Sequence, residues 1–82
     1  MNFFGIVIAI YYNDHEPSHF HAIYGEHSGT FAIKNLQMIE GSLPRRAISL
    51  VLEWAFFHRK ELERNWKLAK EHKSLLWIEP LE

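Results

Sequence analysis

The segment from Asp14 to His21 holds most of the side chains in this chain that could do chemistry. Three histidines and two carboxylates fall within these eight residues. If this part of the chain enters a strand, His19 and His21 point to the same face, because side chains alternate along a strand. Two imidazoles on one face form a two-point ligand for a divalent metal ion. A third ligand could come from a nearby imidazole or carboxylate: His15, Glu16 or Glu26. We therefore expect His19, His21 and His15 as metal ligands, and we predict no cofactor beyond such a divalent ion.

The same imidazoles could instead transfer protons. A histidine general base needs a carboxylate that orients its ring, and Glu16 and Asp14 are the nearest in sequence. His19, His21 and Glu16 are accordingly the candidate catalytic residues of a metal-independent, ribonuclease-like reaction. A His-x-His pair on a half-exposed strand is equally compatible with a purely structural or interface role, so three interpretations stay open.

A row of cations marks the C-terminal half of the chain. Lys60, Arg64 and Lys67 recur at the helical spacing i, i+4, i+7. Such a face could follow the phosphate backbone of RNA or DNA, although a solvated outer helix face has the same pattern. The net charge of −1 lacks the basic excess that is typical of a bulk nucleic-acid binder.

Length and composition limit what could position these residues. The 82 residues suffice for one domain, residues 1–82. The absence of cysteine excludes disulfides, thiolate zinc sites and cysteine nucleophiles, and it suits a reducing cytoplasm. The apolar run over residues 3–12 is too short to cross a bilayer, so we expect a cytoplasmic protein without a membrane partner.

A small sheet is expected to carry the histidine segment. Residues 3–12 are rich in β-branched side chains that point both ways, which predicts a strand covered on both faces. Residues 19–24 alternate, and a five-residue turn over residues 25–29 leads to a third strand over residues 30–34. Residues 36–40 give a weaker signal for a fourth strand.

A long helix is expected to follow the sheet. Ser42 could cap its start and Pro44 suits its first turn. Apolar residues then recur at spacings of three and four over residues 44–71, and residues 47–57 are apolar nearly all round, which predicts deep burial. The fold class is thus α+β, with a small antiparallel sheet of three or four strands packed against one long C-terminal helix. The expected core combines the first strand with apolar residues of the sheet and helix: Phe20, Phe31, Val51, Ala55 and Leu62.

The second half of that helix extends beyond the reach of a small sheet. A helix over residues 44–71 would be about 42 Å long. It must project, bend near residues 58–60, or pack on a partner. The tail over residues 75–78 is also apolar and could add a strand. The apolar stripe of the helix and this tail would then be covered by the chain itself, by a second copy or by another protein. The candidate partner-binding residues are Leu62, Trp66 and Trp77.

Several of these features together resemble a known family. An aromatic-rich first strand leads to Asn13-Asp14 and then to Glu16-Pro17-x-His19-x-His21. A glycine-containing hairpin follows, and then a helix that reads His58-Arg59-Lys60-Glu61-Leu62…Trp66. Over nearly the whole chain, the pattern resembles the small prokaryotic family numbered 4160 among the domains of unknown function. Its loop typically reads Glu-Pro-Pro-His-x-His and its helix Arg-Glu-Glu-Leu-x-x-x-Trp. Ser18 here replaces the second proline, and Lys60 replaces a glutamate.

The resemblance implies a function through a partner. Members of that family are commonly encoded beside another small domain, in an arrangement similar to toxin–antitoxin pairs. The expected function is therefore a small cytoplasmic component of a toxin–antitoxin-like pair. Its expected partner is the small protein encoded by the neighbouring gene, or a second copy of itself. The ribonuclease-like toxin and the His-x-His metal-binding module are the alternatives.

Overall fold

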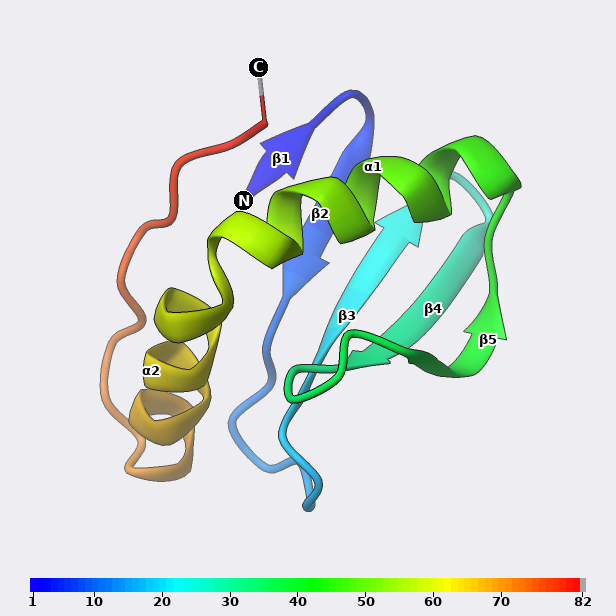
Figure 1. Ribbon diagram of the computed structural model, residues 1–82. Coiled ribbons are helices and arrows are strands. Elements are labelled where there is room, and N and C mark those ends of the chain that lie inside the picture. The colour runs from blue at the N-terminus through cyan, green and yellow to red at the C-terminus, as the bar shows by residue number, and fades with distance from the viewer. Residues whose placement is uncertain (82) are drawn as a thin grey trace.

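The structure, a computed structural model, describes residues 1–81, and within them five antiparallel strands form one sheet (Figure 1). The strands lie in the sheet in the order in which they occur along the chain. They are β1 (Asn2–Phe3), β2 (Ile6–Ala9), β3 (His19–Tyr24), β4 (His27–Ala32) and β5 (Met38–Ser42). The predicted α+β class with an antiparallel sheet is confirmed, but the sheet has five strands rather than three or four.

The first predicted strand is in fact a hairpin. Phe4 and Gly5 form a two-residue turn between β1 and β2, and both have positive φ, at 49° and 80°. Positive φ at both central residues is what a tight hairpin turn of the twist-matched type requires. Only one face of β2 is covered, because Ile6 and Ile8 are buried while Val7 is exposed. The expectation of a strand covered on both faces was wrong.

The next two strands pair through a shorter turn than predicted. The strand over residues 19–24 is confirmed as β3. Its partner β4 begins at His27, since Tyr24 pairs with His27 and only Gly25 and Glu26 remain for the turn. β5 covers residues 38–42 rather than 36–40. Its Gly41 has φ 89° and lies so close to Ser28 of β4 that a Cβ atom would clash with its backbone.

Two helices replace the single long helix. α1 (Arg45–Phe57) and α2 (Arg59–Lys70) are separated at His58, whose φ of −122° and ψ of 22° interrupt the helix. A straight helix over residues 44–71 would be about 42 Å long, whereas the longest dimension of the chain is 33 Å. The bend was one of the three alternatives that the sequence left open. Ser42 does not cap α1, because it is the last residue of β5 and Pro44 occupies the N-cap position.

The core lies between α1 and one face of the sheet, and α2 lies beside the sheet (Figure 1). The predicted core residues are all buried in one cluster with Ile6 and Ile8 of β2: Phe20, Phe31, Val51, Ala55 and Leu62. Large apolar side chains on the sheet and on one stripe of the helices meet there, so their removal from water stabilises the fold. α1 covers this face of the sheet, whereas Trp66 of α2 reaches His19 on the opposite face.

The C-terminal tail runs back along the helices without forming the predicted strand. Asn65 of α2 is fully buried; its amide donates to the carbonyl of Leu76 and accepts from the Leu76 N–H, at 2.9 and 2.8 Å. The Trp54 indole donates to the carbonyl of Glu79 at 2.8 Å, and Ile78 is fully buried between these anchors. The apolar stripe of α2 is therefore covered within the chain itself. Neither helix has the length and apolar character that a membrane span needs.

Candidate functional site

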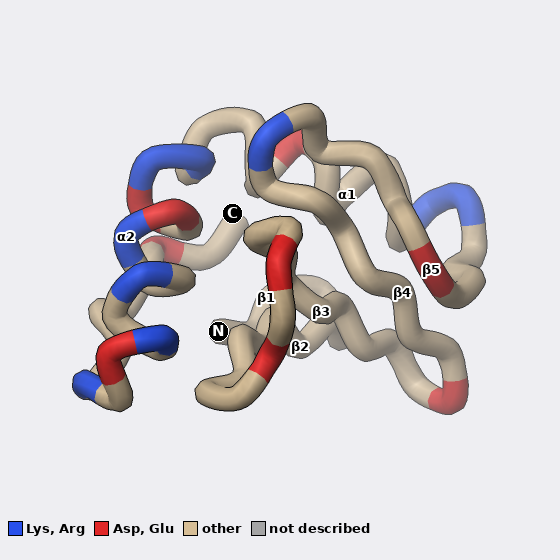
Figure 2. Tube along the Cα trace, turned by 90° about the horizontal axis from the view of Figure 1, so that it is seen from below, with Lys and Arg blue, Asp and Glu red and all other residues tan. Residues whose placement is uncertain are grey.

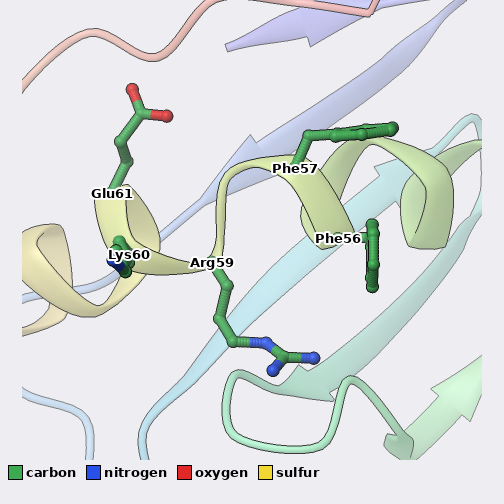
Figure 3. Close-up of a pocket in the computed structure, with 5 residues that line it drawn as sticks. All are labelled: Phe56, Phe57, Arg59, Lys60 and Glu61. Atoms are coloured by element: carbon green, nitrogen blue, oxygen red, sulfur yellow. The ribbon is translucent and has the colours of Figure 1, made fainter.

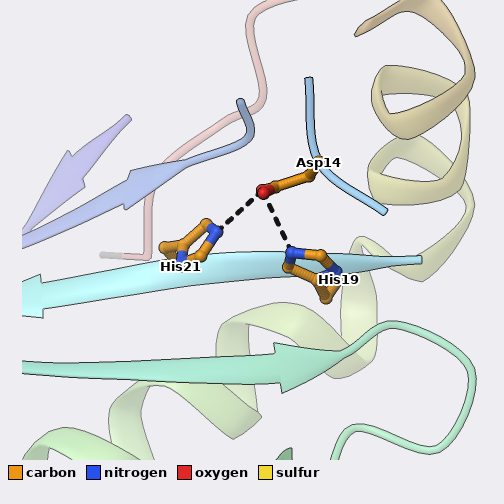
Figure 4. A group of neighbouring side chains, drawn as sticks. All are labelled: Asp14, His19 and His21. Carbon is orange, nitrogen blue, oxygen red and sulfur yellow. Dashed lines mark hydrogen bonds and ion pairs between the residues drawn. The ribbon is translucent and has the colours of Figure 1, made fainter. Parts of the chain in front are cut away.

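A histidine pair and an aspartate meet on the face of the sheet that α1 does not cover (Figure 4). β3 alternates, so Phe20 points into the core while His19 and His21 share the other face. This shared orientation confirms what the strand period predicts. Asp14 comes from the loop between β2 and β3 and reaches over the strand toward both rings.

Both imidazoles converge on one oxygen atom. The Nε2 atoms of His19 and His21 each lie 3.0 Å from Oδ2 of Asp14. The other ring nitrogens are also held. Nδ1 of His19 donates to the carbonyl of Pro17 at 2.7 Å, and Nδ1 of His21 lies 3.3 Å from the Thr30 hydroxyl on the neighbouring strand. The loop that contains Pro17 also has a cis peptide bond between Glu16 and Pro17.

These partners restrict where protons can lie. A carbonyl oxygen can only accept, so Nδ1 of His19 carries a hydrogen, and Nε2 of the neutral ring presents a lone pair. That lone pair faces a carboxylate oxygen, which is also an acceptor when ionised. A proton or a metal ion must therefore lie between Nε2 of His19 and Oδ2 of Asp14, so the geometry suits either a hydrogen-bonded pair or a bound metal ion. His21 is less constrained, because the Thr30 hydroxyl can donate or accept.

The carboxyl group of Asp14 is tuned by the same contacts. Partial burial raises its pKa, but the hydrogen bond with His21 and the attraction of both histidines outweigh burial. The net result is a pKa below the ordinary value of 3.8. Asp14 is accordingly an anion across the neutral range and is available either to a metal ion or to protonated imidazole.

The site is partly exposed and has aromatic neighbours. The side chains of Asp14, His19 and His21 are 26%, 11% and 23% exposed. The Tyr11 ring lies 4.6 Å from His21 and the Trp66 ring lies 4.9 Å from His19. A ligand could thus reach the site from solvent, while the rings restrict how the imidazoles turn.

A further charged layer surrounds the Trp66 ring. Lys70 lies over the Trp66 ring, 5.6 Å from its centre, and its ammonium group is 3.3 Å from the Glu16 carboxylate. Glu16, which was expected to orient a catalytic histidine, pairs with this lysine instead, and Asp14 contacts both imidazoles. The sequence had named Asp14 only as an alternative orienting carboxylate.

The three side chains match the ligand set of a transition-metal ion. One ligand atom from each residue lies within 4.8 Å of the others. Ligands of a tetrahedral zinc ion lie about 3.3 Å apart at bond lengths of about 2.0–2.1 Å. The two separations between Oδ2 of Asp14 and the imidazole Nε2 atoms, 3.0 Å each, are close to that distance. The group holds Asp14 where His15 was expected. His15 is exposed, and Glu26 lies in the turn at the opposite end of β3.

The remaining predicted residues fall into two groups. Lys60, Arg64 and Lys67 are exposed on α2, where Figure 2 shows Lys and Arg gathered. Leu62 and Trp66, expected at a partner interface, are buried in the core, whereas Trp77 of the tail is exposed. The basic face and Trp77 are thus free to meet other molecules, and the apolar stripe of α2 is not.

Comparison with known proteins gives one match. The model of a family described as a domain of unknown function (DUF4160) matches residues 5–67, which include the three residues of the site. No curated protein and no solved structure matches the chain.

Proposed function

The chain belongs to the DUF4160 family of domains of unknown function, and we propose that it binds one divalent transition-metal ion through Asp14, His19 and His21. The observation that supports this proposal is that the Nε2 atoms of His19 and His21 each lie 3.0 Å from the same carboxylate oxygen, Oδ2 of Asp14. The Nδ1 atoms are engaged by Pro17 and Thr30. Metal-binding histidines are typically oriented in this way, by an outer partner that fixes the ring and its tautomer.

The donor set favours some ions over others. Two imidazole nitrogens and one carboxylate oxygen suit zinc, iron, cobalt or nickel, whereas calcium and magnesium prefer oxygen ligands alone. Three protein ligands leave coordination positions open, as in catalytic rather than structural zinc sites. The partly exposed site supports water as the further ligand, and a metal-activated water molecule would serve in hydrolysis.

A second candidate function uses the same residues without a metal. The 3.0 Å contacts of Asp14 with His19 and His21 are also ordinary distances for charge-assisted hydrogen bonds. Asp14 would then orient the rings, and His21, the more exposed of the two, would act as the general base. This is the ribonuclease-like alternative, with Asp14 in the role first given to Glu16.

The toxin–antitoxin-like pairing implied by the family resemblance stays a prediction. Of its three expected contact residues, Trp77 is the one on the surface. A partner that binds there would lie against the tail rather than against the apolar stripe of α2. The metal site and the partner contact are therefore separate proposals that different variants can test.

Thermal unfolding during metal titration distinguishes the two candidate functions. The protein is stripped with a chelator and titrated with Zn²⁺ or Ni²⁺, next to His19→Ala/His21→Ala and a His27→Ala control. We expect Tm to rise with metal concentration in the wild type and the control but not in the double variant, because an ion that binds only the native state stabilises it.

Activity is assayed on the same samples. If the protein cleaves single-stranded RNA, and if this activity persists after chelation but is lost in the double variant, the result would support the metal-free alternative. A Tm that no metal ion shifts, or that shifts equally in the double variant, would contradict the metal site.

A further inference from the structure

Two adjacent phenylalanines at the end of α1 are exposed against expectation. The side chains of residues 47–57 were predicted to be deeply buried, but Phe56 is 64% and Phe57 is 72% exposed. Their rings meet edge to face with centres 5.4 Å apart. The prediction of deep burial was wrong because only one side of α1 packs against the sheet, and the rest of its surface faces solvent. Phe56 and Phe57 lie outside the metal site and outside the core cluster.

The two rings line a surface hollow with charged neighbours. The hollow has a volume of about 500 Å³, and the start of α2 completes its lining: Arg59, Lys60 and Glu61. Figure 3 shows Phe56 and Arg59 extending to the same side of the junction between the helices. A contiguous apolar pair with a charged border is the pattern of an interaction surface rather than of scattered exposed residues.

The charge of this border is net positive, because it holds two cations, Arg59 and Lys60, and one anion, Glu61. The carboxylate of Glu61 is already engaged by Nδ1 of His58. Within residues 1–81, neither Arg59 nor Lys60 forms an ion pair, and Arg64, one turn further along α2, has none either. Cations without intramolecular partners beside an apolar pair complement an occupant that carries both negative charge and an apolar side chain.

We propose that Phe56, Phe57, Arg59 and Lys60 form a docking surface for an acidic protein segment with an apolar anchor residue. The anchor packs against the two rings, and the flanking carboxylates pair with Arg59 and Lys60. Aromatic and arginine side chains are the residue types that dominate binding at such surfaces. Single-stranded nucleic acid fits less well, because the edge-to-face pair occupies one of the ring faces on which a base would have to stack.

Synthetic peptides test the proposal with the full-length protein. The probe is a fluorescent peptide of glutamates around a central leucine and tryptophan. One control peptide has lysine for every glutamate, and a second has serine for both apolar residues. We expect the acidic apolar peptide to bind at least tenfold more tightly than either control and to weaken as salt is added.

Matched variants locate the binding on the protein. Phe56→Ser/Phe57→Ser and Arg59→Glu/Lys60→Glu should each weaken binding at least tenfold. Val7→Ser/Ile39→Ser and Arg45→Glu/Arg46→Glu, which alter exposed residues elsewhere, should change it less than twofold. Because all these side chains are exposed, Tm should stay close to that of the wild type in every variant.

Other occupants would appear as different results. Self-association that Phe56→Ser/Phe57→Ser abolishes would identify a second copy as the occupant and overturn the proposal. Tighter binding of a polyuridine oligonucleotide would overturn it in favour of nucleic acid. Equal affinity for acidic and basic peptides, or wild-type affinity in both patch variants, would show that the surface does not select an acidic segment.

Discussion

His19 donates its Nδ1 hydrogen to the carbonyl oxygen of Pro17, two residues earlier, across 2.7 Å. This bond ties the loop between β2 and β3 to the first residue of β3. It also fixes which nitrogen of the neutral ring keeps a lone pair. The arrangement therefore prepares Nε2 of His19 to bind a cation next to Asp14.

Asp14, rather than His15 or Glu16, should be the third metal ligand. Asp14→Asn should weaken zinc binding at least tenfold, because the amide oxygen is neutral and a poorer ligand than carboxylate. His15→Ala and Glu16→Gln should leave affinity nearly unchanged, since His15 is exposed and Glu16 pairs with Lys70. Competition with a zinc-binding dye measures all three. A loss in His15→Ala that equals the loss in Asp14→Asn would contradict this ligand set.

Trp66 should contribute to stability, and Trp77 should not. Trp66 is buried against His19, and replacing a buried Trp with Ala costs about 3–5 kcal/mol. Trp77 is exposed, so Trp77→Ala should change the free energy of unfolding by less than about 0.5 kcal/mol. Urea denaturation gives both values, with Trp66→Phe as a milder variant if Trp66→Ala does not fold. Equal stability of Trp66→Ala and wild type would contradict the packing of α2.

Asn65 should hold the tail in place. Asn65→Ala removes both bonds to the Leu76 backbone and should cost about 1–3 kcal/mol, the usual cost of leaving such groups unpaired. Asn35→Ala, which loses only exposed bonds to Gln37, serves as the control. Limited proteolysis should cut the tail of Asn65→Ala much faster than that of the control. Identical cleavage rates would show that the tail does not depend on Asn65.

The lowered pKa of Asp14 predicts a dependence of stability on pH. A carboxyl group whose pKa is lower in the folded state stabilises the fold above its unfolded pKa, and the contribution disappears as pH falls through the folded pKa. Without metal, wild type should therefore lose its stability advantage over Asp14→Asn as pH falls below the ordinary value of 3.8. Urea denaturation at a series of pH values in chelator measures the difference. A difference that stays constant into strong acid would contradict the ion pairs of Asp14.

Periodicity predicted the parts of the fold that depend on one face being buried. The strand over residues 19–24 and the shared face of His19 and His21 follow from the two-residue period. The cluster around Phe20 and Val51 follows from apolar residues spaced along strand and helix. In each case the burial of one face determines the side-chain direction, and burial can be read from residue type.

The features that the sequence missed depend on the path of the backbone in space. The turn at Phe4 and Gly5 lies inside an unbroken apolar run, so no polar residue marks it. The break at His58 carries neither proline nor glycine, so the sequence left a bend near residues 58–60 as one of three alternatives. The break places Trp66 in the core beside Leu62. The exposure of Phe56 and Phe57 follows from the way α1 crosses the sheet, which residue type does not encode.

The third residue of the site was missed for a similar reason. His15 and Glu16 are closer in sequence to His19 than Asp14 is, and proximity along the chain favoured them. The loop instead turns Asp14 over β3 and leaves His15 in solvent. Loop geometry, rather than residue spacing, determines which carboxylate reaches both imidazoles.

Isothermal titration calorimetry with Zn²⁺ tests the central claim most directly. Chelator-treated wild type is titrated next to His19→Ala/His21→Ala and His27→Ala. We expect one zinc ion per chain in the wild type and in His27→Ala, with binding lost in the double variant. At a free zinc concentration 100 times the Kd, zinc should add about 2.7 kcal/mol to the free energy of unfolding. A wild-type protein that binds no zinc, or a double variant that still binds one ion with wild-type affinity, would contradict the account.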